Sequence, residues 1–218
     1  LFKLKSGNSN ALIAAVLEVT EKIVENSVQA ILKCFREQVL PKNFGPTAHT
    51  RDFYLQQQAK TVELLYGIED TLFIICDGTY LRHEKSANNV YQRKSYSRQK
   101  KTPLCKPFTI CTTNGYIVDL AGPFNGTIND AKILQRVLEN ETGLMSILKK
   151  GDVFVLDRGF RDVKNFLEDK GFVALMPALK GNTKQLSTED SNSSRCVTKI
   201  HWVIECVHGI IGQKYKLL

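Results

Sequence analysis

Two apolar runs that each end in an aspartate constrain this chain more than any other feature. The first, Leu72–Tyr80 (LFIICDGTY), places five apolar residues before Asp77 and a glycine. The second, Val153–Phe160 (VFVLDRGF), leads to Asp157, with a glycine two residues later. Short apolar runs closed in this way predict buried strands. Each strand then delivers one carboxylate to an edge of a sheet.

The two carboxylates predict a cation between them. Two acids brought together without compensation repel, and one of them tends to stay protonated. A third acid, Glu205, lies inside the apolar segment Trp202–Val207, where a carboxylate is costly unless it is paired or binds a cation. We therefore expect Asp77, Asp157 and Glu205 to bind Mg²⁺ or Mn²⁺. Such ions can activate water and stabilise the leaving oxygen of a phosphodiester.

Each of these acids also has a simpler interpretation. Asp77 can be a turn-forming aspartate, because Asp-Gly turns are common. Asp157 can pair with the arginine that follows it or cap a helix, and Glu205 can pair with a lysine such as Lys199. Each signal alone is weak, and their joint placement favours the metal site.

Other ionisable residues extend or compete with this set. Asp130 begins the helix expected after a hairpin, where it is an accessory metal-ligand candidate or ordinary first-turn chemistry. Asp152 and Asp162 are expected to be structural. A local alternative is a transition-metal site of His201, Glu205 and His208, whose spacing of four and three places them on one helical face.

The order of elements predicts the fold class. Asn114-Gly115 divides two β-rich runs and is a strong hairpin signal. Around it the order is strand, hairpin, helix, strand, helix, strand, helix, with the last helix over Lys199–Ile211. Three antiparallel strands followed by parallel strands with crossover helices predict an α/β fold, a ribonuclease H-like mixed sheet with flanking helices. We assign residues 67–218 to this nuclease-type domain.

Residues 1–66 are predicted to be a separate helical segment. Apolar residues recur at spacings of three and four from Ser9 to Phe35, which indicates two short helices with a tight turn. Asn10 and Thr20 are the expected caps. The pair can form a helix-turn-helix, or a small bundle packed on the main domain, since its second helix carries glutamates. One further helix is expected over Asp52–Tyr66.

The charge of the chain favours a polyanionic partner. Among 218 residues, 30 lysines and arginines against 22 acids give a formal charge of +8, which makes nucleic acid the expected partner class. The charge gathers in a basic segment, Gln92–Lys106, which overlaps an exposed loop expected over Ser86–Pro103. Tyr91 and Tyr96 can stack there. A solvated loop is the alternative. The candidate phosphate-binding residues are Arg93, Lys94, Arg98, Lys100, Lys101 and Lys106.

Other classes of protein are disfavoured. The six cysteines form no C-x-x-C pair and are interpreted as reduced thiols. The chain has no apolar run of about eighteen residues and no signal-like start, so neither membrane spanning nor secretion is expected.

Several motifs together resemble the nuclease domain of Harbinger-type DDE transposases. They are DGTY at Asp77, QRKSYS at Gln92, NGYIVDLAGPF at Asn114, NDAKIL at Asn129, GDVFVLDRGFRD at Gly151 and TKIHWVIECVHG at Thr198. The resemblance covers roughly residues 70–215, and the preceding helices resemble the helix-turn-helix that often accompanies this domain. Cys206 and His208 depart from the pattern, which has smaller or amide residues there.

The resemblance implies an acid triad of Asp77, Asp157 and Glu205, a divalent metal, DNA cleavage with strand transfer, and a nuclear location. The leading hypothesis is thus a metal-dependent DNA endonuclease of transposase descent. The alternative is a catalytically inactive domesticated protein that binds DNA or a partner, and a third hypothesis is a ribonuclease. A separate DNA-binding partner protein and a homo-oligomer are compatible with each.

Overall fold

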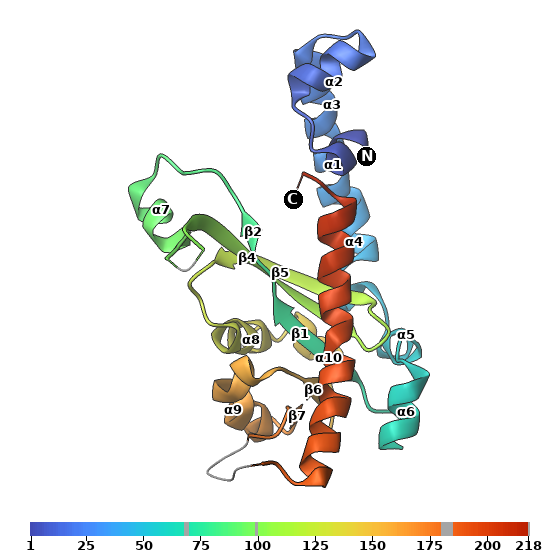
Figure 1. Ribbon diagram of the computed structural model, residues 1–218. Coiled ribbons are helices and arrows are strands. Elements are labelled where there is room, and N and C mark those ends of the chain that lie inside the picture. Colours follow the sequence, from blue (N-terminus) through green and yellow to red (C-terminus); the bar gives the residue numbers. More distant parts are fainter. Residues whose placement is uncertain (68–69, 99, 180–184, 218) are drawn as a thin grey trace.

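The computed structural model describes residues 1–67, 70–98, 100–179 and 185–217, and shows a mixed sheet with helices on both faces (Figure 1). Its strands are β1 (Phe73–Gly78), β2 (Leu81–Arg82), β3 (Tyr96–Ser97), β4 (Thr102–Thr112), β5 (Ile117–Asn125), β6 (Val153–Val155) and β7 (Val173–Leu175). Its α-helices are α1 (Phe2–Ser6), α2 (Asn10–Leu17), α3 (Glu21–Cys34), α4 (Leu40–Asn43), α5 (Arg51–Gln56), α6 (Lys60–Tyr66), α7 (Asn89–Ser95), α8 (Asp130–Glu139), α9 (Lys164–Asp169) and α10 (Thr188–Lys214).

The sheet has the predicted ribonuclease H-like topology. The strand order is β2-β4-β1-β6-β7, with β3 and β5 also paired to β4. β1 runs antiparallel to β4 and parallel to β6, and β6 runs parallel to β7. Because the antiparallel strands come first and the parallel additions follow through helices, the expected fold class is confirmed.

The predicted hairpin joins β4 and β5. The turn residue Gly115 has φ 89°, a left-handed conformation that glycine adopts without strain. The side chain of Asn114 accepts a hydrogen bond from the Tyr116 amide at 2.9 Å. The first strand of the hairpin extends further than the apolar pattern indicated. It begins at Thr102, inside the basic segment.

Two apolar cores cover the two faces of the sheet. On one face, α8 and α9 pack over residues such as Ile74, Phe108 and Phe154. On the other, α10 packs through Val197, Ile200 and Ile204 against Phe73, Ile75, Val153 and Val155. Alternation of side chains along β1 and β6 fills both cores, and it fixes where α10 crosses the sheet.

Residues before the sheet are helical, as expected. Two further short helical turns, Phe35–Val39 (π) and Pro46–Ala48 (3₁₀), lie among these helices. Thr20 caps α3 by accepting from the Ile23 amide, but α2 is capped by Ser9 instead of Asn10. The single helix predicted over Asp52–Tyr66 is wrong: it is divided into α5 and α6. The division lies where Ala59 donates its amide to Thr113 of the β4–β5 turn at 2.7 Å.

Two further element predictions need correction. The loop over Ser86–Pro103 contains α7 and β3, because Asn88 caps a helix by accepting from Val90 and Tyr91 amides; Gln99 lies outside the described residues. The last helix, expected over Lys199–Ile211, begins earlier, at Thr188, with Ser187 as its cap. Residues 180–184, before it, lie outside the described residues. Residues Arg158–Val163 form a 3₁₀-helix that precedes α9, which begins at Lys164.

Candidate active site

Asp77 and Asp157 lie at the same edge of the sheet. In the parallel pairing of β1 with β6, Phe73 is opposite Val153, Ile74 opposite Phe154 and Ile75 opposite Val155. The same register continued by two residues places Asp157 beside Asp77. Because β1 and β6 are parallel neighbours, the acids that follow their carboxyl ends lie together. This is the arrangement expected from the two apolar runs that end in aspartate.

Asp77 is the most perturbed carboxyl group of this corner. The pKa of Asp77 is raised to about 7, chiefly by burial and to a smaller extent by the charges of Asp130, Asp157 and Glu205. The hydrogen bond that the Gly78 amide donates to Asp77 Oδ1 at 2.8 Å opposes this rise. The other three acids therefore all act electrostatically on the carboxyl group of Asp77.

Asp157 and Glu205 are exposed to solvent. Asp157 accepts a hydrogen bond from the Gly159 amide at 2.8 Å and so caps the 3₁₀-helix that follows β6. This is the capping role considered as an alternative, and its second carboxylate oxygen has no hydrogen bond in the described chain. Glu205 lies on α10 and has no ion pair with Lys199 or another described residue.

Asp130 forms an ion pair with a buried lysine. Lys106 is 2% exposed, and its ammonium group lies 3.1 Å from Asp130 Oδ1 and donates to the Ile128 carbonyl at 2.8 Å. Burial raises the pKa of Asp130, and the charge of Lys106 opposes the rise. A Cβ at Gly78 would collide with the Asp130 carboxylate and lie 2.8 Å from Lys106 Cδ. The glycine of D-G-T thus makes room for this ion pair.

His208 and His201 bring α10 into contact with the acid corner. His208 Nδ1 lies 3.7 Å from Asp77 Oδ2, and its Nε2 lies 2.9 Å from Thr109 Oγ1. Burial and the charge of His201 lower the pKa of His208 to about 4, so His208 is neutral near pH 7 and does not form an ion pair. Sequence reasoning placed both histidines on one helix face and missed the contact with Asp77.

The donor set suits a divalent cation chemically. It offers carboxylate oxygens from Asp77, Asp157 and Glu205. Asp130 adds two more, which already contact the Lys106 ammonium group at 3.1 and 3.2 Å. Across residues 1–67, 70–98, 100–179 and 185–217, however, no three His, Cys, Asp or Glu side chains are gathered tightly enough to hold a metal as they stand. The carboxylates lie within electrostatic range of one another, and an ion would have to draw them closer. The same finding applies to the His201–Glu205–His208 alternative and does not separate it from the acid set.

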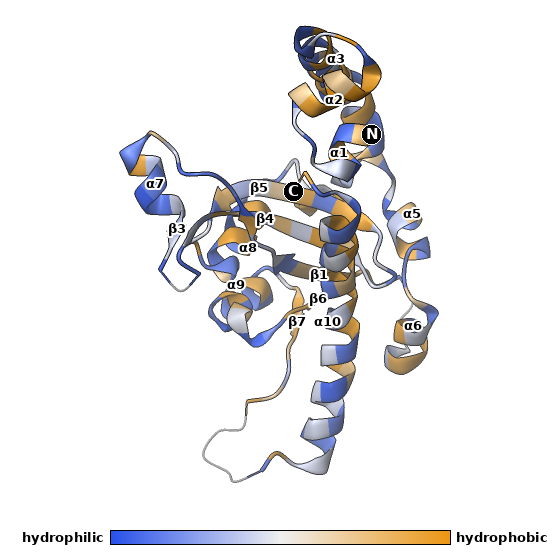
Figure 2. Ribbon diagram, turned by 45° about the horizontal axis from the view of Figure 1, so that its top comes forward, coloured by the Kyte–Doolittle hydropathy of each residue, from blue (hydrophilic) through white to orange (hydrophobic). Residues whose placement is uncertain are grey.

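Five of the six candidate phosphate-binding residues are exposed: Arg93, Lys94, Arg98, Lys100 and Lys101. Beside them lies a hollow of about 590 Å³ lined by Lys85, Gln92, Arg93, Tyr96 and Arg98. Figure 2 colours α7 mainly as hydrophilic. Lys106 does not have the exposed position expected for a phosphate contact, because β4 carries it into the interior and Asp130 binds its ammonium group.

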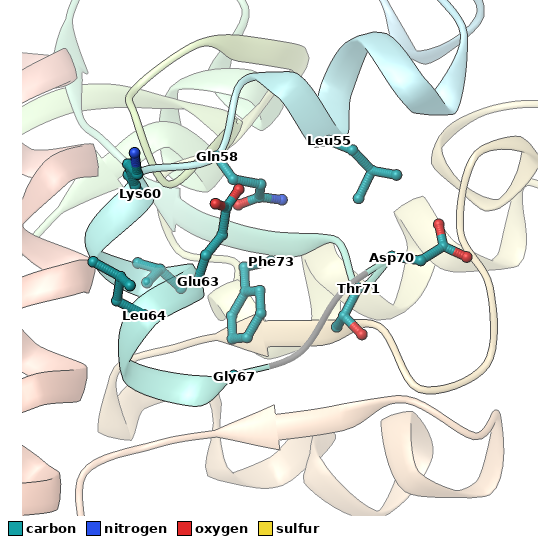
Figure 3. A pocket seen from close by; sticks show the side chains of 10 residues that line it. Leu55, Gln58, Lys60, Glu63, Leu64, Gly67, Asp70, Thr71 and Phe73 are labelled. Carbon is teal, nitrogen blue, oxygen red and sulfur yellow. The ribbon is translucent and has the colours of Figure 1, made fainter.

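A separate hollow of about 400 Å³ lies at the opposite end of β1 (Figure 3). Its lining includes Gln58, Lys60 and Glu63 around α6, and Thr71 and Phe73 at the start of β1. No member of the acid set lines it, so it is not part of the candidate active site.

Comparisons with known proteins identify one family. A profile described as DDE superfamily endonuclease matches residues 76–218, and no curated protein matches the chain. The crystal structure of the Mos1 strand transfer complex has 16% identity, covers 95% of this chain and 74% of that chain, and gives a TM-score of 0.32. The Mos1 mariner paired-end complex with Mn has 17% identity, coverages of 95% and 75%, and a TM-score of 0.32. Likenesses with TM-scores this low carry no argument. No helix in the described parts of the chain is long and apolar enough to cross a membrane.

Proposed function

The chain belongs to the DDE superfamily endonuclease family, and from this premise we propose that it is a divalent-metal-dependent DNA endonuclease of transposase descent that acts in the nucleus. The observation that carries the proposal is the corner where Asp77, on β1, is half-buried beside the charges of Asp130, Asp157 and Glu205. A strongly perturbed carboxyl group surrounded by other acids is typical of a functional site. We also propose strand transfer, as the family resemblance implies.

Asp77, Asp157 and Glu205 would hold Mg²⁺ or Mn²⁺, with Asp130 as an accessory ligand if Lys106 releases it. When bound, such an ion lowers the pKa of a water and stabilises the leaving oxygen of a phosphodiester. Asp157 is suited to this role because one oxygen is fixed by the Gly159 amide and the side chain is open to solvent. Asp77 contributes from the buried side, where its carboxylate is costly without a cation.

The other residues of the corner orient these acids. Thr109, opposite Asp77 in β4, holds His208 through its hydroxyl group, and His208 in turn lies against Asp77. Because His208 is neutral near pH 7, it leaves the negative charge of the corner to be balanced by a cation. The exposed cations of the basic segment would hold DNA phosphates beside the acids.

Nicking of supercoiled DNA in the presence of Mn²⁺ tests the proposal. We expect cleavage by the wild-type chain and a loss of more than about a hundredfold in Asp157→Ala, since removing a ligand costs more than disturbing its outer shell. Asp162→Asn, an exposed acid five residues away, is the matched control and should cleave normally. Cleavage that survives Asp157→Ala would show that the assigned acids do not perform the reaction. Parallel assays on an RNA–DNA hybrid separate DNA cleavage from ribonuclease activity.

A second candidate function is a catalytically inactive, domesticated protein that binds DNA or a partner. It is favoured by the exposed apolar side chains of α2, α3 and the turn after them, which include Leu12, Val16, Ile23, Ile31 and Phe35. Such surfaces mark interaction sites in many proteins, and a homo-oligomer or a separate DNA-binding partner protein would cover them. Absence of nicking in a chain that still binds DNA would support this function over the nuclease.

A further inference from the structure

A second basic surface lies on the β7 side of Asp157. Two adjoining hollows, of about 210 Å³ and about 300 Å³, share Arg158 and Pro177 in their linings. The first is lined on its other side by Arg161 and Lys164, and the second by Arg195 and Lys199 of α10. We call the two hollows together the Arg158 groove. The groove includes Arg158, the residue that follows Asp157, so it adjoins the acid corner along the chain.

The groove is positively charged, because no acidic side chain lines either hollow. Arg195 and Lys199 are exposed, lie four residues apart on one face of α10, and have no ion pair in the described part of the chain. Arg161 and Lys164 have only exposed partners, Asp162 and Glu168, each at 3.7 Å. Surface pairs of this kind contribute little and are readily exchanged for another anion.

One member of the groove is held in place. The Arg158 guanidinium donates to the Ala178 carbonyl at 2.9 Å, and the Ala178 amide donates to Ser194 of α10 at 2.9 Å. These bonds connect Arg158 to the helix that carries Arg195 and Lys199. The cations therefore come from two elements that are connected to each other, as a site for a backbone with several negative charges requires.

The Arg158 groove is distinct from the basic segment. α7 and β3 lie at the β2–β4 side of the sheet, whereas β7 and the start of α10 lie at the other side (Figure 1). The acids lie between the two surfaces: Asp77 on β1, Asp157 just after β6 and Glu205 on α10. A single duplex held at the acids would therefore meet cations on both sides.

We propose that Arg158, Arg195 and Lys199 form a second phosphate-binding groove that holds a DNA backbone on the β7 side of the acid corner. This inference rests on the proposed function for its location beside a cleavage site. It does not depend on catalysis, because lysine and arginine bind phosphate oxygens with or without a reaction.

The test measures binding of a labelled DNA duplex to the full chain by fluorescence anisotropy across salt concentrations, without divalent metal so that cleavage does not interfere. The variant Arg195→Ala/Lys199→Ala is compared with Lys149→Ala/Lys150→Ala. The control removes the same number of charges before β6, at the opposite end of that strand. Both pairs contain exposed residues, and alanine favours the α10 helix.

We expect the Arg195/Lys199 variant to lose two phosphate contacts, so that its salt slope falls by about 1.8. Its loss of affinity between about 50 and about 200 mM salt then becomes about tenfold smaller than that of the wild type. The control should keep the wild-type slope. An unchanged slope in the Arg195/Lys199 variant, a loss confined to an RNA duplex, or a wild-type chain that binds no DNA overturns the groove.

These outcomes separate the groove from the nuclease proposal. A reduced slope together with absent nicking by the wild-type chain would retain the groove and remove the nuclease. Nicking by the wild-type chain together with an unchanged salt slope in the Arg195/Lys199 variant would retain the nuclease and remove the groove.

Discussion

Asp152 and Asp77 lie at opposite ends of the same pair of strands and have opposite surroundings. Asp152, just before β6, is 1% exposed and makes two hydrogen bonds of 2.7 Å with the Arg51 guanidinium. It also accepts the amides of Leu72 and Lys149. Asp77, at the end of β1, accepts one backbone amide and lies among other acids.

The difference distinguishes a structural acid from a candidate functional one. The charge of Asp152 is balanced by a cation within the chain, and four donors satisfy its oxygens. The charge of Asp77 has no such cation beside it, because the nearby Lys106 is bound to Asp130 and His208 is neutral near pH 7. Full pairing at one end of the sheet and incomplete pairing at the other indicate where a ligand can act.

The largest expected effect is on stability at the paired end. Asp152→Ala should lower the free energy of unfolding by about 3–5 kcal/mol, because it removes the buried partner of an Arg51 guanidinium that is only 11% exposed. The remaining carboxylate, Asp70, lies 3.8 Å away and is itself 65% exposed. Urea denaturation measures the loss of stability. Asp162→Asn, whose pair with Arg161 is 66–74% exposed, is the control and should change stability by less than about 0.5 kcal/mol. Equal losses of stability in Asp152→Ala and Asp162→Asn would show that Asp152 is not a structural acid.

At the Asp77 end of the sheet, we expect the free energy of unfolding to depend on pH. The pKa of Asp77 is raised to about 7 in the folded chain, so folding favours its protonated form. This contribution is fully present below about pH 4, the ordinary range of an aspartate, and is lost as the pH rises through about 7. Without metal, Asp77→Asn should therefore be more stable than the wild type at pH 8 by a few kcal/mol, since one pKa unit corresponds to about 1.36 kcal/mol.

Urea denaturation of both chains from pH 4 to pH 8 measures this difference, which should close at the acidic end. A constant difference over the whole range would show that Asp77 does not titrate as its burial requires.

Metal binding should stabilise the folded chain through the acids at the Asp77 end of the sheet. At a metal concentration about one hundred times its Kd, Mg²⁺ or Mn²⁺ should raise the free energy of unfolding of the wild type by about 2.7 kcal/mol. Thermal unfolding with and without metal measures it. Asp77→Asn and Asp157→Asn should lose this increment, and Asp162→Asn should keep it. An equal increment in Asp157→Asn would place the metal elsewhere.

The sequence predicted those parts of the site that depend on local patterns. The apolar runs and their terminal acids predicted β1, β6 and the proximity of Asp77 to Asp157, because parallel register follows from the pairing. Asn114-Gly115 predicted the hairpin, and Asn129 caps α8 as first-turn chemistry suggested. Each of these signals lies within a few residues of the structure that it determines.

The missed features depend on contacts between distant segments. Arg51 and Asp152 are 101 positions apart, and nothing near either residue in the sequence indicates the other. The charge of Lys106 groups it with the basic segment, although the apolar residues around it match a buried strand. The contact of His208 with Asp77 depends on how α10 crosses the sheet, which packing on β1 and β6 decides.

The smallest expected effect tests whether the glycine after Asp77 serves a turn or a contact. Gly78 does not have a left-handed φ, so its backbone conformation does not demand glycine. A Cβ there would press on Asp130 and Lys106, and overpacking of this kind costs about 1–3 kcal/mol. Gly78→Ala should therefore be destabilised by that amount in urea denaturation. Gly209→Ala, at an exposed position of α10 with no neighbour within 4 Å, should be neutral or stabilised by up to about 1 kcal/mol. If Gly78→Ala were as stable as the control, the Lys106–Asp130 pair would not be packed against β1, and Asp130 would be free to join Asp77 as a ligand.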